Sequence, residues 1–321
     1  MAVGVILANG AWWDRPLPIE GAETYINKGL VYQNSFVISF NHDLDSTWSG
    51  EKPEISDGSI VIGGGLASID VAKIITLTCT QRELAKRGID VELNTLEVKG
   101  IPKTLAAHNL SWEELGLVGS TIYYRRRMED MPLVEIPDGA DENRVAKTKK
   151  SRQTILDKAT RKFMFSVEPL SAPDELIVED GELVGIRFRR TRVEGGKVLT
   201  TEETFERHAP VVISSIGSIP EPIHGISMNG ELFDFTDKEF GRLDRYPTVF
   251  SVGNVVTGKG NIVASRKHAH RVSEQAIEVY LGVSAEGAEA TEMELTLSEE
   301  GDRIANTIVA HAELQSPLSE P

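Results

Sequence analysis

The sequence "VIGGGLASIDVAK" occupies residues 61–73, where an apolar run enters three glycines and continues with helical spacing. With Ser59 and Ile60 the run predicts a buried strand, and the residues after the glycines predict a helix that ends at Gly88. A strand, a glycine turn and a helix in this order are typical of a dinucleotide-binding domain. The stretch therefore predicts an α/β fold with a Rossmann-like domain.

Each position of this motif has an expected role. Gly63 permits the tight turn, and Gly65 lets a pyrophosphate approach the backbone, while Ser68 is small enough for close packing of the helix on the strand. The helix that begins near Leu66 offers free N–H groups and the positive end of its dipole. The alternative is a tight turn without a ligand. The predicted nucleotide contacts of the loop are Gly63, Gly64, Gly65, Leu66, Ala67 and Ser68.

The end of the second strand decides which dinucleotide is expected, and two alignments of the sequence compete. "IDVELNTLE" places Glu97 there, where a carboxylate would hold the ribose of NAD. "STIYYRRR", residues 120–127, is the better strand and ends in arginines. We prefer it, with Arg125 and Arg126 as ligands of a 2′-phosphate, which favours NADP over NAD.

The structural alternative for these arginines is an exposed basic turn paired with Glu129 and Asp130.

Two further segments share one plan. "GVILANGAWWDRPLPIEG" (residues 4–21) and "PVVISSIGSIPEPIHG" (210–225) each contain an apolar run, a small-residue turn and P-x-P-I-x-G. A segment of this kind usually closes a unit that began earlier in the chain. "VGNVVTGKGNIVASRKHA" (252–269) places two glycine turns before a helix, so Gly253 and Asn254 are candidates to hold a phosphate or ribityl chain. The alternative is a loop that only caps the helix.

The rest of the chain is less specific. We expect a strand at 3–8, loop-like structure at 22–58, a short helix in "SWEELG" and a surface helix within 138–162 whose basic residues form a solvated face. Residues 175–206 alternate around Asp180-Gly181 and Gly195-Gly196, which predicts an antiparallel β-meander. A long helix is expected before Gly282, and a peripheral tail with one helix near 297–312 after it.

The composition excludes several classes of function. The net charge of −15 over 321 residues argues against a broad surface for nucleic acid or anionic membranes. No apolar run approaches the roughly 20 residues needed to span a bilayer, and the first residues lack the basic flank of a signal peptide. We therefore expect a cytoplasmic protein with no nucleic-acid partner and no membrane span.

Cysteine and histidine usage limits the chemistry. Cys79 is the only cysteine, so this chain alone forms no internal disulfide, C-x-x-C redox pair or cysteine-ligated iron–sulfur cluster. Its apolar, helical surroundings predict a buried, inert thiol. His268 and His270 face different sides of a helix, so no metal site is predicted. No catalytic residue can be assigned from the sequence.

The order of five segments resembles a known family: "VILANGAWWDRPLPIEG", "VIGGGLASIDVAK", "YYRRRMEDMP", "VVISSIGSIP" and "FSVGNVVTGKGNIVASRKHA". Together they resemble the flavoproteins with two dinucleotide-binding domains, the pyridine nucleotide-disulfide oxidoreductase superfamily. Within it they are most similar to the branch of the glutamate synthase small subunit and the adrenodoxin-reductase-like ferredoxin–NADP reductases. The resemblance spans about residues 3–282. The matching segments do not include the N-terminal half of the family's FAD domain, which binds the ADP part of FAD.

The resemblance implies an α/β fold in which a Rossmann-like NAD(P)-binding domain is inserted in an incomplete FAD-binding domain of the same three-layer type. The implied domains are a remnant of the FAD domain with a crossover (1–54), the NAD(P)-binding domain with its β-meander (55–220), the C-terminal part of the FAD domain (221–284) and a peripheral tail (285–321). Gly217 joins the NADP contacts. The implied FAD contacts are Asn9, Gly10, Trp12, Gly253, Asn254, Gly258, Lys259, Gly260, Asn261 and Ile262.

The implied function is that of an FAD-dependent NAD(P)H oxidoreductase, or a subunit of one, which passes electrons from NADPH through the flavin to an acceptor. The implied cofactors are FAD and NADP(H) or NAD(H). The expected partners are a separate subunit that supplies the missing half of the FAD site and an iron–sulfur electron acceptor. The alternative is a non-catalytic pyridine-nucleotide-binding module of a larger complex.

Overall fold

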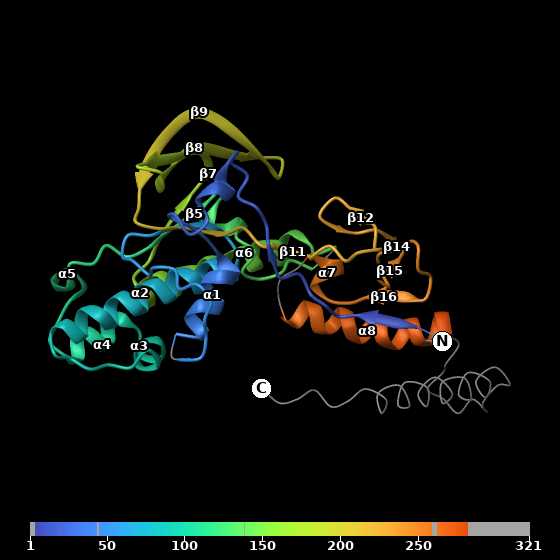
Figure 1. Cartoon of the computed structure of the whole chain (residues 1–321), viewed down its shortest axis with the longest axis horizontal. Coiled ribbons are helices and arrows are strands. Elements are labelled where there is room, and N and C mark those ends of the chain that lie inside the picture. The colour runs from blue at the N-terminus through green and yellow to red at the C-terminus, as the bar shows by residue number, and fades with distance from the viewer. Residues whose placement is uncertain (1–3, 44, 138, 259–261, 282–321) are drawn as a thin grey trace. The chain divides into compact units, whose positions relative to one another are not determined.

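The computed structural model describes residues 4–43, 45–137, 139–258 and 262–281, and Figure 1 shows their secondary structure. The described residues form two compact units. Unit 2 is Asp14–Gly217, and unit 1 consists of the described residues before Asp14 and after Gly217. The predicted tail at 285–321, with its helix near 297–312, lies outside the described residues.

A five-stranded parallel sheet forms the centre of unit 2, in the order β3–β10–β4–β5–β6. Successive side chains of a strand point to opposite faces. Ile60 and Ile62 of β4 accordingly join one apolar cluster, whereas Val61 joins another. A parallel sheet with two apolar faces requires a covering layer on each. The strands are β3 (Leu30–Tyr32), β4 (Ile60–Gly63), β5 (Thr121–Tyr124), β6 (Ser166–Pro169) and β10 (Val212–Ser215).

Helices cover one face of this sheet. Val71 and Ile75 of α2 pack in the same apolar cluster as Phe36 of α1 and Leu156 of α6. Leu84, near the end of α2, packs instead with α3 and α4, which were not predicted, and with α5, the short helix predicted in "SWEELG". The helices are α1 (Gln33–Asn41), α2 (Leu66–Lys86), α3 (Leu93–Lys99), α4 (Ile101–Ala107), α5 (Trp112–Leu115) and α6 (Glu142–Phe163).

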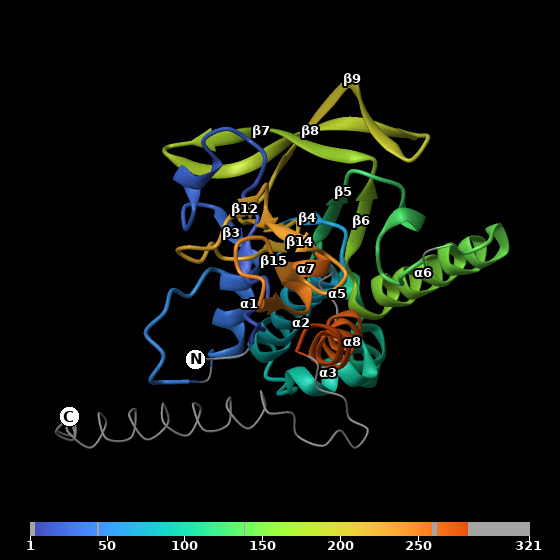
Figure 2. The same ribbon diagram turned by 90° about the vertical axis from the view of Figure 1, so that its right-hand side faces the viewer.

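An antiparallel meander covers the other face. Its strands are β7 (Ser171–Glu179), β8 (Glu182–Glu194) and β9 (Lys197–His208), as the sequence predicted. Phe188 is fully buried and stacks on Tyr123 of β5, with ring centroids 4.1 Å apart. In Figures 1 and 2 the meander lies on the side of unit 2 opposite to α2 and α3. Unit 2 thus has three layers, which confirms the predicted α/β fold with a Rossmann-like domain.

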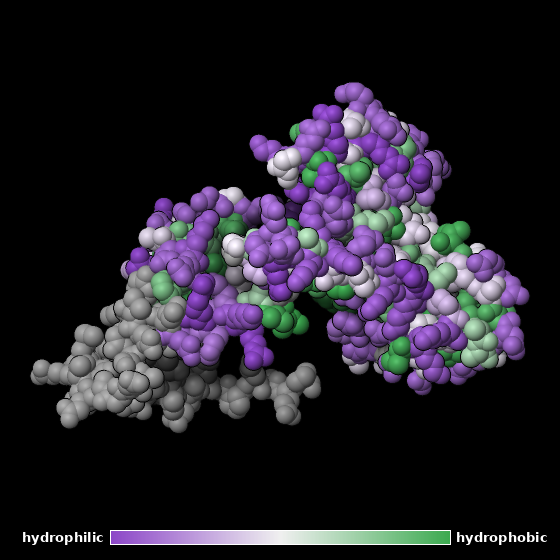
Figure 3. Space-filling model, turned by 180° about the vertical axis from the view of Figure 1, so that it is seen from behind, coloured by the Kyte–Doolittle hydropathy of each residue, from purple (hydrophilic) through white to green (hydrophobic). Residues whose placement is uncertain are grey.

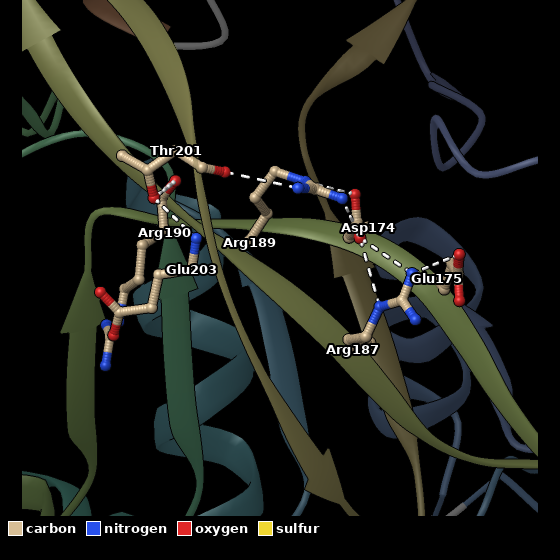
Figure 4. A network of polar contacts seen from close by, with 7 residues as sticks. All are labelled: Asp174, Glu175, Arg187, Arg189, Arg190, Thr201 and Glu203. Carbon is tan, nitrogen blue, oxygen red and sulfur yellow. Dashed lines mark hydrogen bonds and ion pairs between the residues drawn. The ribbon is translucent and has the colours of Figure 1, made fainter.

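Polar contacts tie the meander strands together (Figure 4). Asp174 of β7 accepts hydrogen bonds from Arg189 of β8, at 2.9 Å from both Nε and Nη2. It also accepts one from Arg187 Nη2 at 3.2 Å. These arginines hold the pKa of Asp174 below its ordinary value. The meander is therefore held by charge-assisted hydrogen bonds as well as by its backbone ladder.

The segment 22–58 differs from the loop-like structure expected for it. It contains the 3₁₀ turn η1 (Ala22–Tyr25) followed by β3 and α1. Because β3 pairs with β10, residues 14–54 lie in unit 2 and not with the first residues of the chain. β3 has only three residues, too few to show a periodicity of their own.

Unit 1 contains a smaller sheet in the order β1–β16–β15–β14, in which β1 and β16 are parallel. Phe233, Leu243 and Val255 form its main apolar cluster. Two short strands, β2 (Trp13–Asp14) and β11 (Ser218–Ile219), pair with each other. The other elements are β1 (Val5–Leu7), β12 (Met228–Asn229), β13 (Leu232–Phe233), β14 (Phe235–Asp237), β15 (Arg242–Leu243), β16 (Val249–Ser251), α7 (Asn254–Thr257) and α8 (Ile262–Leu281).

One face of the described residues is mainly polar (Figure 3). The face in Figure 3 shows hydrophilic side chains over most of its area, with apolar side chains in small separate groups. Among the described helices, none combines the length and the apolar character that crossing a bilayer requires.

Asp14 is half-buried at the start of unit 2, next to the first turn of α1. Its carboxylate accepts the Asn34 N–H, with N···O distances of 3.2 and 3.1 Å. Burial raises the pKa of Asp14 to about 6, and the hydrogen bond opposes that shift. Because the folded-state pKa exceeds the ordinary value of 3.8, the neutral carboxyl stabilises the fold, and this contribution is lost as the pH rises through about 6.

We predict that Asp14→Asn makes the fold more resistant to unfolding above about pH 7, because the amide still accepts the Asn34 N–H without a buried charge. The expected gain is about 1–2 kcal/mol at pH 8, reduced from the full shift because the group is half-exposed. Near pH 4 the two proteins should be equally stable. Urea unfolding at both pH values measures this, and a variant no more stable than the wild type at pH 8 would contradict it.

Candidate nucleotide-binding site

Three loops of unit 2 leave the sheet at one edge. In the parallel register Gly63 lies opposite Ser215, and Ile62 lies opposite Tyr123. The glycine loop after β4, the arginines after β5 and the turn after β10 therefore follow the carboxyl ends of neighbouring strands. This edge is where open α/β sheets bind their ligands.

The first two glycines of the loop are required by the packing of the chain itself. A Cβ atom on Gly63 would lie 2.2 Å from the Ser215 carbonyl oxygen and 2.3 Å from Ser68 Oγ. A Cβ atom on Gly64 would lie 2.2 Å from the ring of Tyr124. Both contacts are far too short for any residue with a side chain, so folding alone explains these two glycines.

Gly65 has no such explanation. A Cβ atom there would have no protein atom within 4 Å. Its φ of −87° and ψ of 178° are open to any residue. Gly65 is also the N-cap of α2, and no described side chain caps that helix. The space beside Gly65 is thus open in front of the unpaired N–H groups of a 21-residue helix.

The next three residues divide between surface and core. Leu66 is 46% exposed, and Ala67 is partly exposed. Ser68 is fully buried and donates to Ser215, whose carbonyl and hydroxyl oxygens both lie 3.2 Å from Ser68 Oγ. This contact is the close packing of helix on strand that the small third residue of the motif was expected to allow.

The three arginines after β5 are not equivalent. Arg127 donates to the Val193 carbonyl at 2.8 Å and lies 4.0 Å from Glu129. Arg125 is exposed and Arg126 half-buried, and within the described chain neither guanidinium has a hydrogen-bond or ion-pair partner. Arg125 and Arg126 therefore remain available to a ligand, whereas Arg127 is committed to the fold.

Glu97, the alternative at the second strand, lies elsewhere. It belongs to α3 and pairs with Lys73 of α2 at 3.0 Å. Both side chains line a cavity of about 420 Å³ between α1, α2 and α3. The strand next to β4 is β5, so the structure favours the alignment that ends in arginines.

The turn after β10 is held by a residue that the sequence did not single out. Gly217 has a φ of +100°, which favours glycine. Arg15 stabilises this turn through two hydrogen bonds. Its backbone N–H donates to the Gly217 carbonyl at 3.1 Å, and its side-chain Nη1 donates to the Ile216 carbonyl at 2.9 Å. Arg15 lies in the P-x-P-type segment, but its partner is about 200 residues away in the chain, and no sequence signal links them.

In unit 1 the two predicted flavin loops also leave one edge of a sheet. Leu7 of β1 is paired with Ser251 of β16, so Asn9 and Gly253 follow neighbouring strand ends. Trp12 is 55% exposed. Gly10 and Gly258 have positive φ, and a Cβ atom on either would have no protein atom within 4 Å. Ile262 is 86% exposed. Lys259, Gly260 and Asn261 lie outside the described residues.

Asn254 contains a buried polar atom without a hydrogen-bond partner among the described residues, and it follows a glycine that is bonded to His268. Asn254 Oδ1 has no hydrogen-bond partner within the described chain. The Gly253 N–H donates to His268 Nδ1 at 3.1 Å, and Gly253 has a φ of +83° and a ψ of −144°. Accepting this bond requires an unprotonated Nδ1, and burial lowers the pKa of His268, which favours the neutral ring. An orphaned buried acceptor beside a glycine turn fits a ligand with hydroxyl donors, such as a ribityl chain.

The described residues offer little support for thiol chemistry or for metal binding. Cys79 is buried, and burial raises the pKa of its thiol to about 11. Within the described residues no cluster of three or more His, Cys, Asp or Glu side chains has the arrangement of a metal site.

No protein-family model matches the chain. The chain is 26% identical over 255 residues to the mitochondrial NADPH:adrenodoxin oxidoreductase of Arabidopsis thaliana. That match covers 69% of this chain and 50% of the plant protein, so the chain spans about half the length of the curated relative it matches.

Solved structures of FprA from Mycobacterium tuberculosis share the fold. A mutant form superimposes with a TM-score of 0.61 at 22% identity, covering 96% of this chain and 69% of FprA. FprA in complex with NADPH gives a TM-score of 0.60 at 19% identity with the same coverage. At these identities the likeness establishes the fold.

The two glycines at 63 and 65 give a matched pair of stability predictions. Gly63→Ala should lower the free energy of unfolding by about 2–3 kcal/mol, because its Cβ meets a backbone carbonyl that cannot move aside. Gly65→Ala should leave it unchanged or raise it by up to about 1 kcal/mol. Chemical denaturation without ligand measures both, and equal losses would show that Gly65 is also a packing glycine.

Proposed function

We propose that this chain is part of a flavin-dependent NADPH oxidoreductase in which unit 2 binds NADP(H). The observation that carries the proposal is Gly65, a glycine required neither by backbone conformation nor by packing. A pyrophosphate needs such a position, because its oxygens must come close to the backbone N–H groups at the start of a helix. Gly63, Gly64 and Ser68 build the turn, and Leu66 and Ala67 supply N–H groups.

The arginine turn supports NADP over NAD. Arg125 and Arg126 follow the strand next to the glycine loop and have no partner in the described chain. The ring of Tyr124, the residue before Arg125, lies against Gly64. Planar guanidinium groups bind phosphate oxygens in pairs. We propose that these two arginines contact a 2′-phosphate, with Gly217 at the same sheet edge.

The similar proteins are associated with the same nucleotide as the one proposed here. The name of the Arabidopsis relative specifies NADPH, and one FprA structure contains NADPH. The name of the relative also places that protein in mitochondria, so a cytoplasmic location for this chain stays a prediction from sequence.

We propose that unit 1 contributes to an FAD site. Asn9, Gly10, Trp12, Gly253 and Asn254 would hold it, with Gly258 and Ile262 at the end of the second loop. Flavin would accept two electrons from NADPH and release them singly.

Val5 and Ile6 of the edge strand β1 are 40% and 44% exposed on opposite faces. We propose that this apolar edge receives the residues that complete the FAD site, from a separate subunit.

The electron acceptor in this proposal is an iron–sulfur protein. In a chain of net charge −15, helix α6 concentrates positive charge. Its exposed cations would attract an acidic partner and speed encounter at low salt. They are Arg144, Lys147, Lys150, Lys158 and Arg161.

The arginine turn predicts a nucleotide preference. Arg125→Ala combined with Arg126→Ala should weaken NADPH binding about tenfold or more through lost charge-assisted bonds, and NADH binding by less than about twofold. Arg127→Ala is the matched control, because its guanidinium is already bonded to Val193, and it should leave the preference intact. Calorimetric titrations of the wild type and both variants with NADPH and NADH measure these affinities. Equal losses for both nucleotides would remove the 2′-phosphate assignment.

The orphaned acceptor of Asn254 predicts an effect on flavin. Added FAD should give the chain a bound-flavin absorbance spectrum that NADPH bleaches. Asn254→Ala should weaken FAD about tenfold through the lost hydrogen bond, whereas Asn229→Ala, at the exposed end of strand β12, should not. A colourless chain that binds NADPH would instead support the alternative function, a non-catalytic nucleotide-binding module.

A further inference from the structure

Arg152 of α6 is a buried cation that anchors the segment after the arginine run. Its side chain is only 8% exposed. Nε and Nη2 donate to the Val134 carbonyl at 2.8 and 2.6 Å, and Nη1 donates to the Glu129 carbonyl at 3.2 Å. One guanidinium therefore closes both ends of residues 129–134.

The charge of Arg152 has no counter-ion of its own within the described residues. The carboxylates of Glu129 and Asp130, on the turn itself, lie instead beside Lys149, at 3.8 and 3.9 Å from its Nζ. A buried charge bonded only to carbonyls is costly unless an anion compensates it. The turn thus combines a buried positive charge with the two uncommitted guanidinium groups of Arg125 and Arg126.

The backbone of the arginine turn is fixed on its other side as well. The Leu170 N–H donates to the Arg126 carbonyl at 3.0 Å, and Thr191 Oγ1 donates to the Arg125 carbonyl at 2.9 Å. Tyr124 OH donates to the Asp130 carbonyl at 3.1 Å. Leu170, the residue before β7, and Thr191 of β8 hold the beginning of the turn, and Arg152 holds its far end. A fixed backbone with free side chains reduces the entropy lost when those side chains bind.

We propose that Arg152 is a positioning residue for nucleotide specificity, which holds the turn so that Arg125 and Arg126 distinguish a 2′-phosphorylated dinucleotide from its unphosphorylated counterpart. The inference rests on the proposed NADP(H) function. Arg152 contributes in two ways: it fixes the turn through three hydrogen bonds, and it adds an uncompensated positive charge behind it. The hydrogen bonds of Arg152 go to the turn and not to the glycine loop, so we expect NADH binding to depend on Arg152 much less than NADPH binding does.

The test is calorimetric titration of the full chain with NADPH and with NADH. Arg152→Gln removes the charge and most of the guanidinium's hydrogen bonds to the two carbonyls. It should weaken NADPH binding about tenfold and change NADH binding by less than about twofold. Arg152→Lys keeps the charge but offers one nitrogen to two carbonyls, and it should give an intermediate loss. Lys149→Gln is the matched control, since it removes a cation from the same helix without touching the carbonyls, and it should change NADPH by less than about twofold.

The outcomes separate the two proposals. A wild-type chain that does not prefer NADPH removes the proposed function, whatever the variants do. If the wild type does prefer NADPH, an unchanged preference in Arg152→Gln overturns the role of Arg152, as does an equal loss for both nucleotides. An NADPH loss in Lys149→Gln as large as in Arg152→Gln overturns the positioning role and leaves only a general field effect. If Arg152→Gln does not fold, Arg152→Lys tests the proposal instead. Unchanged NADPH affinity in Arg152→Lys would be incompatible with positioning by the hydrogen bonds of the guanidinium.

Discussion

The insertion of β10 between β3 and β4 is the pairing on which unit 2 depends. β10 is the last strand of the unit in sequence, yet Val212 pairs with Leu30 on one side and Ile60 on the other. The resulting sheet is apolar on both faces, so the chain supplies helices for one face and, between β6 and β10, the meander for the other. The same pairing brings Ser215 against Gly63 and Ser68 and thereby shapes the glycine loop.

The residues of the candidate site fall into two groups, those that contact other parts of the chain and those that have no contact partner among the described residues. Packing accounts for Gly63, Gly64 and Arg127, each of which has a close partner in the chain. Gly65 has no neighbour, and the guanidinium groups of Arg125 and Arg126 have no described partner. The open groups lie on backbone that is held on several sides, which is the arrangement expected of a preorganised binding site.

Local signals in the sequence were enough for the elements that carry their own pattern. The glycine loop and α2, the meander with its Asp180-Gly181 turn and the strand β5 were all predicted. β3 and α1 were missed, because β3 is three residues long and is defined by a strand about 180 residues further along the chain. The two- and three-residue strands β12–β15 were missed for the same reason. The residues of the candidate site could be proposed from the sequence as a set, but the difference between Arg127 and its neighbours could not, since it depends on the Val193 carbonyl of the meander.

We propose that the glycine loop and the arginine turn of unit 2 bind one NADP(H) molecule together. Amide hydrogen exchange of the full chain, with and without saturating NADP⁺, would show whether both segments are protected. We predict slower exchange in peptides covering residues 63–70 and 124–130, and unchanged exchange in the meander tip around Gly195. Protection confined to other segments, or none in either loop at a concentration that saturates binding, would contradict it.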